Sequence, residues 1–419
     1  MDGAVGISQC PVPSGGEFVY NLTIPSDQSG TFWYHAHSGV SQADGLYGGL
    51  VVHKPASRST VRGLLPQRYD DPYRYTYDRE LLLLIGDWYH RPAGDVLEWY
   101  MDPGNFGNEV DSVDAARSNK TNINSIGILF PGQRMDFVLR PLLPISENQS
   151  HMRVQLDQDS FNYANPALTP DQTFPINYRS NAVEGRPLKA HHLNIGEAPS
   201  ASSILRAIPP TAQQTHVVYT KIQKMARFSN KPFGYFNQTT WKPQQDPPIP
   251  LASLPRTKWD ANQFAIPTGP EPAWIDLVIN NLDEGSHPFH MHGHHFYVLA
   301  VHQAEFGWGS YNPFIDKIPP HLKSDADAWR NGTDDAQTLN RGYSSGFYDI
   351  SRAAFRDTVQ IPSRGYAVLR FRADNPGVWL FHCHMLWHSA TGMVMLIDVQ
   401  GDPAGLVAHA GNGELCPAS

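Results

Sequence analysis

The run HCHMLWH at residues 382–388 constrains this chain more than any other feature of its sequence. It places one thiol, that of Cys383, directly between the imidazoles of His382 and His384. Successive side chains of an extended strand point to opposite faces, so the thiol and the two imidazoles must face opposite sides of the backbone. One metal ion can therefore bind on each side of this single strand.

The thiol face has the ligands of a copper site. A thiolate with two imidazoles and a weak axial methionine forms a trigonal blue-copper site. His388 follows Cys383 by five residues, and Met393, ten residues after the thiol, is the axial candidate. The second imidazole can come from the run HPFHMHGH at 287–294, in which His287 stands outside the spaced pair of histidines.

Two pairs of histidines have the spacing of metal ligands. His290 and His292 are two residues apart, as are His35 and His37 in the run WYHAH, and residues so spaced share one face of a strand. An isolated histidine is usually a surface residue or a hydrogen-bonded core residue. Several converging neutral imidazoles, however, are typical of metal sites, so both pairs are predicted to bind metal.

Zinc is the alternative metal for the same residues. Structural zinc prefers four strong ligands from compact spacings, whereas Cys383 is flanked by imidazoles and followed by a methionine at axial distance. Copper is therefore favoured. The next histidines of the second run, His294 and His295, are assigned no ligand role.

Length and charge narrow the class of protein. A chain of 419 residues is too long for one hydrophobic core and predicts two or three domains. Its net charge of −8 gives no basic surface for nucleic acid or an anionic membrane. The longest strongly apolar run, at 81–85, is far shorter than a membrane span. We therefore expect a soluble protein that binds neither nucleic acid nor membrane.

The remaining cysteines and the glycosylation signals indicate secretion. Cys10 and Cys416 can form one bridge between the ends of the chain, and two unpaired thiols are the alternative. Five glycosylation sequons point to a secreted glycoprotein; they begin at Asn21, Asn119, Asn148, Asn237 and Asn331. The first ten residues have neither the charged nor the apolar region of a signal peptide, so we expect an upstream segment to be missing.

The segment pattern predicts an all-β fold. Short β-branched and aromatic runs, such as EFVYNLTI, ELLLLIGDWY, AWIDLVINN and YAVLRFRA, alternate with glycine and proline, as in β-sandwiches. The histidine pairs lie toward opposite ends of the chain, so a shared metal cluster would lie between the first and third units. The expected units are residues 1–57, 75–205 and 215–400, followed by a tail at 401–419.

Three motifs make the chain resemble the multicopper oxidases, the superfamily of laccases, ascorbate oxidases and ferroxidases, and most of all its fungal members. They are WYHAHSGVSQADGLYG at 33–48, HPFHMHGH at 287–294 and DNPGVWLFHCHMLWHSATGM at 374–393. The resemblance implies three cupredoxin-like Greek-key β-sandwich domains, of which the first is truncated at its N-terminus.

The resemblance also implies a role for each ligand. A type 1 copper would take single electrons from a donor, and a trinuclear cluster would reduce dioxygen to water. Asp2 matches the family's acidic residue near the type 2 copper, and a solvated terminal aspartate is the alternative. The implied ligands are His287, Cys383 and His388 for type 1 with Met393 axial, His290 for type 2, and His35, His37, His292, His382 and His384 for the type 3 pair.

The chain departs from the family pattern at two points. The motif H-W-H-G, expected just before Met1, is absent, so one type 2 ligand and one type 3 ligand are missing. We expect a truncated copy of a longer enzyme, and a genuine variant with a defective oxygen site is the alternative. Leu386 stands where many laccases and iron oxidases have an acid three residues after the cysteine.

The favoured function is a laccase-type oxidation of phenolic or other aromatic donors, including pigment or secondary-metabolite precursors, coupled to dioxygen reduction. A ferroxidase is one alternative, with Glu109 as its candidate carboxylate unless that residue is only a surface charge. A copper-binding or electron-transfer protein with a defective trinuclear site is the other. We expect a secreted monomer whose partners are a small reducing substrate and dioxygen.

Overall fold

A computed structural model describes residues 2–25, 28–53, 80–104, 128–136, 149–156, 169–177, 207–303, 348, 350, 353–410 and 416. Within these residues strands predominate over two short α-helices, so the prediction of an all-β fold is confirmed. None of the described helices is long and apolar enough to cross a membrane. The expected second unit, 75–205, lies largely outside the described residues, and the unit boundaries stay predictions.

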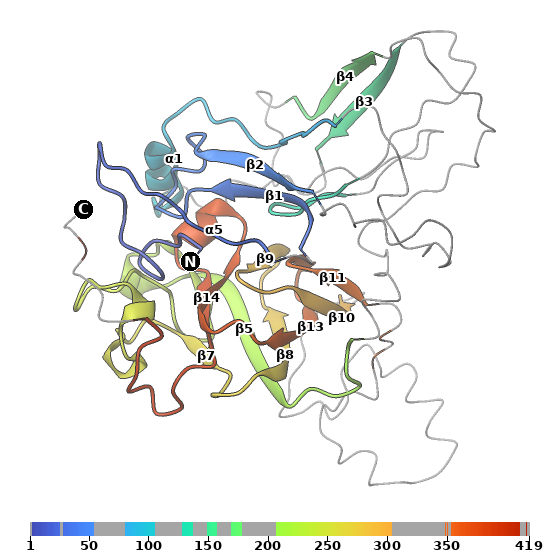
Figure 1. Ribbon diagram of the computed structural model, residues 1–419. Helices are drawn as coiled ribbons and strands as arrows, with labels where there is room; N and C mark the ends of the chain where they lie inside the picture. Colours follow the sequence, from blue (N-terminus) through green and yellow to red (C-terminus); the bar gives the residue numbers. More distant parts are fainter. Residues whose placement is uncertain are drawn as a thin grey trace, which may run out of the picture.

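The third unit contains two facing sheets, seen in the lower half of Figure 1. The first sheet has, in spatial order, β11 (Ala354–Arg356), β10 (Phe296–His302), β13 (Tyr366–Ala373), β8 (Ala273–Asn281), β5 (Gln214–Lys224) and β6 (Pro232–Phe236). The second has β12 (Thr358–Ile361), β9 (His287–Met291), β14 (Gly377–Cys383), β15 (Val394–Val399) and β7 (Ala265–Pro267).

Strand β14 is central in the second sheet and separates two environments. Phe381 and Cys383 face the main hydrophobic core, where the ring of Phe381 stacks on that of Phe289 with centroids 5.4 Å apart. The alternate residues Val378 and Leu380 belong to a second cluster on the other face. Alternate residues of a strand point to opposite faces, and on β14 the face that carries the thiol contacts the main core.

The described elements of the first two expected units are two hairpins and one short helix. Strand β1 (Gly30–His35) pairs antiparallel with β2 (Tyr47–Val52), and Figure 1 shows both next to helix α5 (Leu386–Ala390). Helix α1 (Ala93–Tyr100) buries Val96 and Tyr100 against Trp387 of α5. A separate hairpin pairs β3 (Gln149–Gln155) with β4 (Asp171–Asn177).

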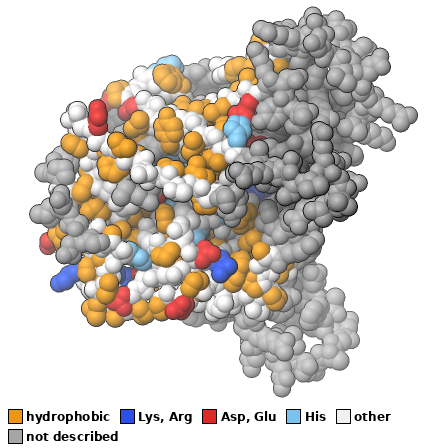
Figure 2. Space-filling view, in the orientation of Figure 1, with side chains coloured by type: hydrophobic (Ala, Val, Ile, Leu, Met, Phe, Trp, Pro, Cys, Tyr) orange, Lys and Arg blue, Asp and Glu red, His pale blue; other side chains and the backbone are white. Residues whose placement is uncertain are grey.

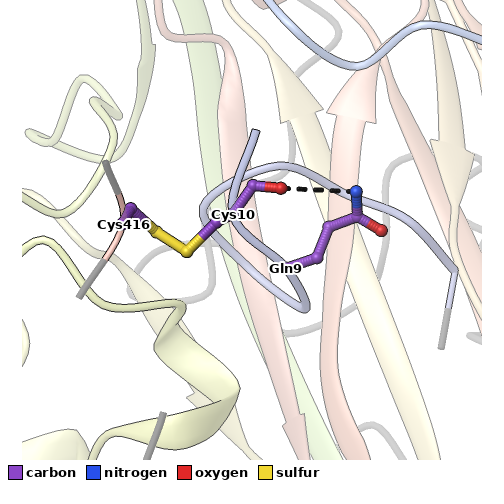
Figure 3. The surroundings of a disulfide bond; sticks show 3 residues. All are labelled: Gln9, Cys10 and Cys416. Atoms are coloured by element: carbon purple, nitrogen blue, oxygen red, sulfur yellow. Dashed lines mark hydrogen bonds between the residues drawn. A yellow bond between two sulfur atoms is a disulfide. The ribbon is translucent and has the colours of Figure 1, made fainter. Parts of the chain in front are cut away.

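The N-terminal segment is fastened to the sandwich. Backbone hydrogen bonds join Gly6 O to Leu251 N at 3.1 Å and Ile7 O to Ala252 N at 2.9 Å. A disulfide links Cys10 to Cys416, as Figure 3 shows, so the predicted bridge is confirmed. These contacts place the first residues of the chain, including Asp2, beside the third unit.

Two of the expected strands are wrong. The runs EFVYNLTI at 17–24 and ELLLLIGDWY at 80–89 form no strand, and none of the described strands pairs with them. Apolar alternation stabilises a strand only with a hydrogen-bonding neighbour and a surface to cover. Val19 is instead 85% exposed and Leu81 73%. Figure 2 shows hydrophobic side chains spread widely over the described surface of one face.

Candidate metal centres

A thiol and two imidazoles converge at the first candidate centre. Cys383 ends β14, His287 begins β9, and His388 lies in α5. The Cys383 Sγ atom lies 3.8 Å from Nδ1 of His287 and 3.7 Å from Nδ1 of His388, and the two nitrogens are 3.1 Å apart. All three side chains are buried. This donor set fits copper, which is the metal of trigonal sites with one thiolate and two imidazoles.

Met393 lies against this centre through the backbone. Its N–H donates to His388 O at 2.9 Å, and its carbonyl accepts from the N–H of Cys383 at 3.1 Å. Its side chain is fully buried in the same core cluster as the thiol. Two hydrogen bonds thus hold the backbone of Met393 beside Cys383 and His388, while its role as the axial ligand stays a prediction.

A carboxylate that the sequence analysis missed holds the outer edge of this centre. His287 Nε2 donates to Asp283 Oδ2 at 2.9 Å, so its Nδ1 faces the thiol. Burial alone would lower the pKa of His287, but the hydrogen bonds to Asp283 and Cys383 raise that pKa to about 10. A histidine ligand typically donates its second ring N–H to a carboxylate or carbonyl. The only sign of this partner in the sequence was its spacing, because Asp283 lies four residues before His287.

The second candidate centre is a cluster of six imidazoles. Its nearest nitrogens, Nε2 of His292 and Nε2 of His382, are 3.2 Å apart, and His37 lies within reach of the same metal position. The cluster joins the first and third units, because the ring centroids of His35 and His384 are 5.2 Å apart. Its members are His35, His37, His290, His292, His382 and His384.

Strand register explains this convergence. His382 of β14 lies opposite His290 of β9, and His290 lies opposite Thr358 of β12. His292 and His384 follow the ends of these strands. The predicted opposition of faces is therefore present, with the thiol toward the core and its two neighbours toward the imidazole cluster.

Five of the six imidazoles of this cluster are held neutral. Burial, together with the neighbouring imidazole of His292, lowers the pKa of His35 to about 4 and that of His290 to about 3. The same causes hold the pKa of His37, His382 and His384 well below the usual value. A neutral imidazole has a lone pair free for a metal ion, so the cluster is prepared for metal at neutral pH.

Hydrogen bonds at Nδ1 fix the ring orientation of several members. His290 Nδ1 donates to Asp357 O at 2.9 Å, and His382 Nδ1 donates to Cys383 O at 2.8 Å. His292 Nδ1 donates to Asp2 Oδ2 at 2.8 Å. Burial would raise the pKa of Asp2, but the bond to His292 holds it at about 2. Asp2 is thus a partner of the cluster rather than a solvated terminal residue.

Other candidate residues lie apart from both centres or outside the description. His294 is buried against the rings of Phe371 and Trp379, and His295 stacks on Phe355. Neither belongs to a group of described residues that could hold a metal ion. Glu109 and three of the sequons, at Asn119, Asn148 and Asn331, lie outside the described residues.

Comparison with known proteins identifies the family. Multicopper oxidase models match residues 1–57 and 225–402, which contain every histidine of the two centres. The chain belongs to the multicopper oxidase superfamily. Copper is accordingly its cofactor, and the thiolate and imidazole donors described above suit that metal.

Relatives in this superfamily include enzymes with different names. The chain is 26% identical to iron transport multicopper oxidase FET5 of Saccharomyces cerevisiae, over 94% of this chain and 66% of that protein. It is 24% identical to laccase-2 of Cryptococcus neoformans, over 96% and 73%. The crystal structure of Fet3p, a multicopper oxidase that functions in iron import, matches with a TM-score of 0.63 and 18% identity, over 98% of this chain and 79% of that one.

The chain therefore spans about two thirds of the length of curated relatives such as FET5. The solved structures share its cupredoxin-like β-sandwich fold. Both iron oxidases and laccases match at comparable identity. Family membership consequently leaves both the activity of this chain and its donor to be proposed.

Proposed function

We propose that this multicopper oxidase is of laccase type and removes single electrons from phenolic or related aromatic donors while reducing dioxygen to water. The observation that carries the proposal is the position of one strand between two centres. Cys383 meets two imidazoles on the core face of β14, and its sequence neighbours His382 and His384 join the imidazole cluster on the other face.

The proposed ligands follow this division. Copper bound there would accept single electrons at the thiolate centre and reduce dioxygen at the imidazole cluster. We assign His287, Cys383 and His388 to a type 1 copper with Met393 axial, His290 to a type 2 copper, and His35, His37, His292, His382 and His384 to a type 3 pair.

Residues of the chain connect the two centres and orient one of the proposed ligands. Cys383 is joined to His382 and to His384 by one peptide link each, which gives a short covalent path between the faces of β14. The hydrogen bond from His382 Nδ1 to Cys383 O adds a second path. Asp2 orients His292 and places a carboxylate beside the cluster, where protons are consumed as water forms.

Asp283 supports donor oxidation at the thiolate centre. Its side chain is 17% exposed and accepts a hydrogen bond from His287, so it joins a proposed ligand to the surface. A phenol that loses an electron also releases a proton, and a carboxylate at the imidazole edge can accept that proton. Asp283 is thus suited to both binding a phenol and deprotonating it.

A ferroxidase-type activity is the second candidate, and the same carboxylate favours it. Ferrous iron binds to carboxylates in mixed oxygen and nitrogen sites, and the relative FET5 is named for iron transport. Electrons from iron held at Asp283 would reach His287 through one hydrogen bond of 2.9 Å. The two candidates differ in what the carboxylate does, which a substitution can separate.

Oxygen uptake by the copper-loaded chain with a phenol and with ferrous iron tests both candidates. We expect Asp283→Asn to slow phenol oxidation about 10- to 100-fold, the usual effect of a lost outer partner of a ligand. Glu284→Gln is the matched control, because Glu284 is the neighbouring carboxylate but pairs with Arg364 and is 83% exposed. A loss confined to iron would favour the ferroxidase.

Retained blue colour without uptake from either donor would contradict an oxidase of either kind. That result would favour a copper-binding or electron-transfer protein. A complete lack of copper binding would contradict all three functions.

We also propose that the protein is secreted and glycosylated. The Cys10–Cys416 bridge supports this location, because disulfides persist in oxidising compartments. Asn21 and Asn237, the two sequon residues within the described chain, are both exposed. Mass shifts on enzymatic removal of glycans from protein secreted by a eukaryotic host would test it.

A further inference from the structure

The imidazole cluster is assembled from two parts of the chain that fold around different sheets. His35 and His37 lie at the end of β1, whereas the other four imidazoles belong to the sandwich. The ring centroids of His37 and His292 are 4.7 Å apart, so histidines of both parts can reach one metal only while the two parts keep this separation. Contacts outside the cluster that join β1 to the sandwich therefore bear on the geometry of the site.

Arg134 makes such a contact with both parts. Its Nε donates to Thr31 O of β1 at 3.1 Å. Its Nη1 and Nη2 donate to Oδ1 and Oδ2 of Asp357 at 2.5 and 2.7 Å. The guanidinium side chain is only 20% exposed and the carboxylate 13%. A planar fork that binds a carboxylate at two points fixes direction as well as distance.

Asp357 passes this restraint directly to the cluster. Its carbonyl oxygen accepts the hydrogen bond from His290 Nδ1 at 2.9 Å, and the hydroxyl of the next residue, Thr358, lies 3.0 Å from the same nitrogen. The ring of His290 is therefore oriented by Asp357, whose carboxylate Arg134 binds.

The segment that carries Arg134 touches the cluster at a second point. Gln133 Nε2 donates to Thr358 O at 3.3 Å. Gly132 packs so closely on His384 that an added Cβ would lie 2.7 Å from its Cγ atom. Residues 128–136 thus contact β1 through Arg134, β12 through Gln133 and the imidazole of His384 through Gly132.

We propose that Arg134 is a positioning residue of the trinuclear site, whose guanidinium orients His290 and holds β1 where the histidines of both parts converge. The inference rests on the proposed function only for the identity of the metal. It assigns a role in the oxygen site to a segment that supplies none of the proposed ligands.

The test compares Arg134→Gln and Arg134→Lys with Arg256→Gln in the copper-loaded chain. Arg256 is a matched control, since its side chain is 24% exposed and pairs with Asp398, which is no proposed ligand. The readouts are copper per chain, the electron paramagnetic resonance spectrum of the type 2 copper, and the blue absorption of the type 1 copper.

We expect Arg134→Gln to weaken copper retention at the imidazole cluster about 10- to 100-fold and to alter the type 2 spectrum, with the blue absorption unchanged. Arg134→Lys should recover only part of this loss, because an ammonium keeps the charge but not the fork. Arg256→Gln should leave both spectra unchanged. Asp357→Asn, which preserves side-chain shape, should reproduce the Arg134→Gln signature and serves if that variant does not fold.

Three results would overturn the inference. One is a type 2 spectrum and copper retention in Arg134→Gln equal to those of the unsubstituted chain. Another is full recovery in Arg134→Lys, and the third is equal loss of both centres in Arg134→Gln and Arg256→Gln. These readouts follow bound copper and not turnover. A copper-loaded chain without oxygen uptake would therefore contradict the proposed function, while its copper content and spectra would still test the role of Arg134.

Discussion

Gly132→Ala tests whether residues 128–136 shape the imidazole cluster in solution. Gly132 has a φ of +82°, and an added Cβ would lie 2.7 Å from Cγ of His384. The backbone N–H of His384 donates to Pro288 O at 2.6 Å, which fixes the base of the side chain, and the ring packs against the rings of Trp33, His35 and His290, so it cannot move aside freely. The substitution must therefore displace either the loop or the imidazole.

Two costs add up at Gly132. An L-residue in the left-handed region costs roughly 1–2 kcal/mol, and overpacking of a buried contact costs roughly 1–3 kcal/mol more. Gly15 has a similar φ of +73° but nothing within 4 Å of an added Cβ, so Gly15→Ala isolates the first cost. We expect Gly132→Ala to lower the free energy of unfolding by about 2–5 kcal/mol and Gly15→Ala by about 1–2 kcal/mol.

Denaturant unfolding of the metal-free chains measures this difference, and the near-ultraviolet absorption of the type 3 copper pair in the loaded chains reports the cluster. The blue absorption of the type 1 copper serves as the internal reference. Gly132→Ala should weaken the type 3 signal while the blue band stays constant. If Gly132→Ala cost no more stability than Gly15→Ala and kept the full type 3 signal, the close contact with His384 would not exist in solution.

Further predictions concern the thiolate centre and the neutral imidazoles. Cys383→Ser should abolish the blue absorption of the copper-loaded chain, and a blue band that survived would mean that another residue supplies the thiolate-like ligand. Met393→Leu should shift the reduction potential while largely retaining the colour, because the axial ligand tunes the potential; an unchanged potential in redox titration would assign Met393 to packing alone. The pKa values of His35, about 4, and His290, about 3, lie below the ordinary histidine value of about 6.5, so the unfolded chain binds protons first as pH falls. The metal-free chain should therefore lose stability from pH 6.5 downward, by up to about 1.4 kcal/mol per pH unit for each such histidine, and equal denaturation midpoints at pH 7 and pH 5 would contradict this.

Local sequence pattern was sufficient for the central strands and for the opposition of faces at the thiol. Strands β8 and β13 coincide with the predicted runs AWIDLVINN and YAVLRFRA, whose residues are buried almost throughout. The positions of His382 and His384 opposite Cys383 follow from strand geometry alone. These features depend on neighbours in sequence, so a single chain reveals them.

The features that the sequence analysis missed depend on distant partners. Arg134 and Asp357 are 223 residues apart, and neither stands out by type or spacing before the fold brings them together. Asp283 was closer to its partner, His287, yet an aspartate in a turn is common on any surface. The exposed runs at 17–24 and 80–89 were wrongly predicted to be strands for the same reason. A strand requires a hydrogen-bonding partner, and its own sequence does not show whether one is present.

The bridge between Cys10 and Cys416 turns the intervening polypeptide into a closed covalent ring. A single proteolytic cut inside that ring, for example in the exposed run at 81–85, opens the ring but leaves both fragments in one molecule. Nicked protein would thus migrate as one species on a gel without reductant and separate into two when thiols are added. A cut inside the ring would consequently leave every residue of the chain in one molecule.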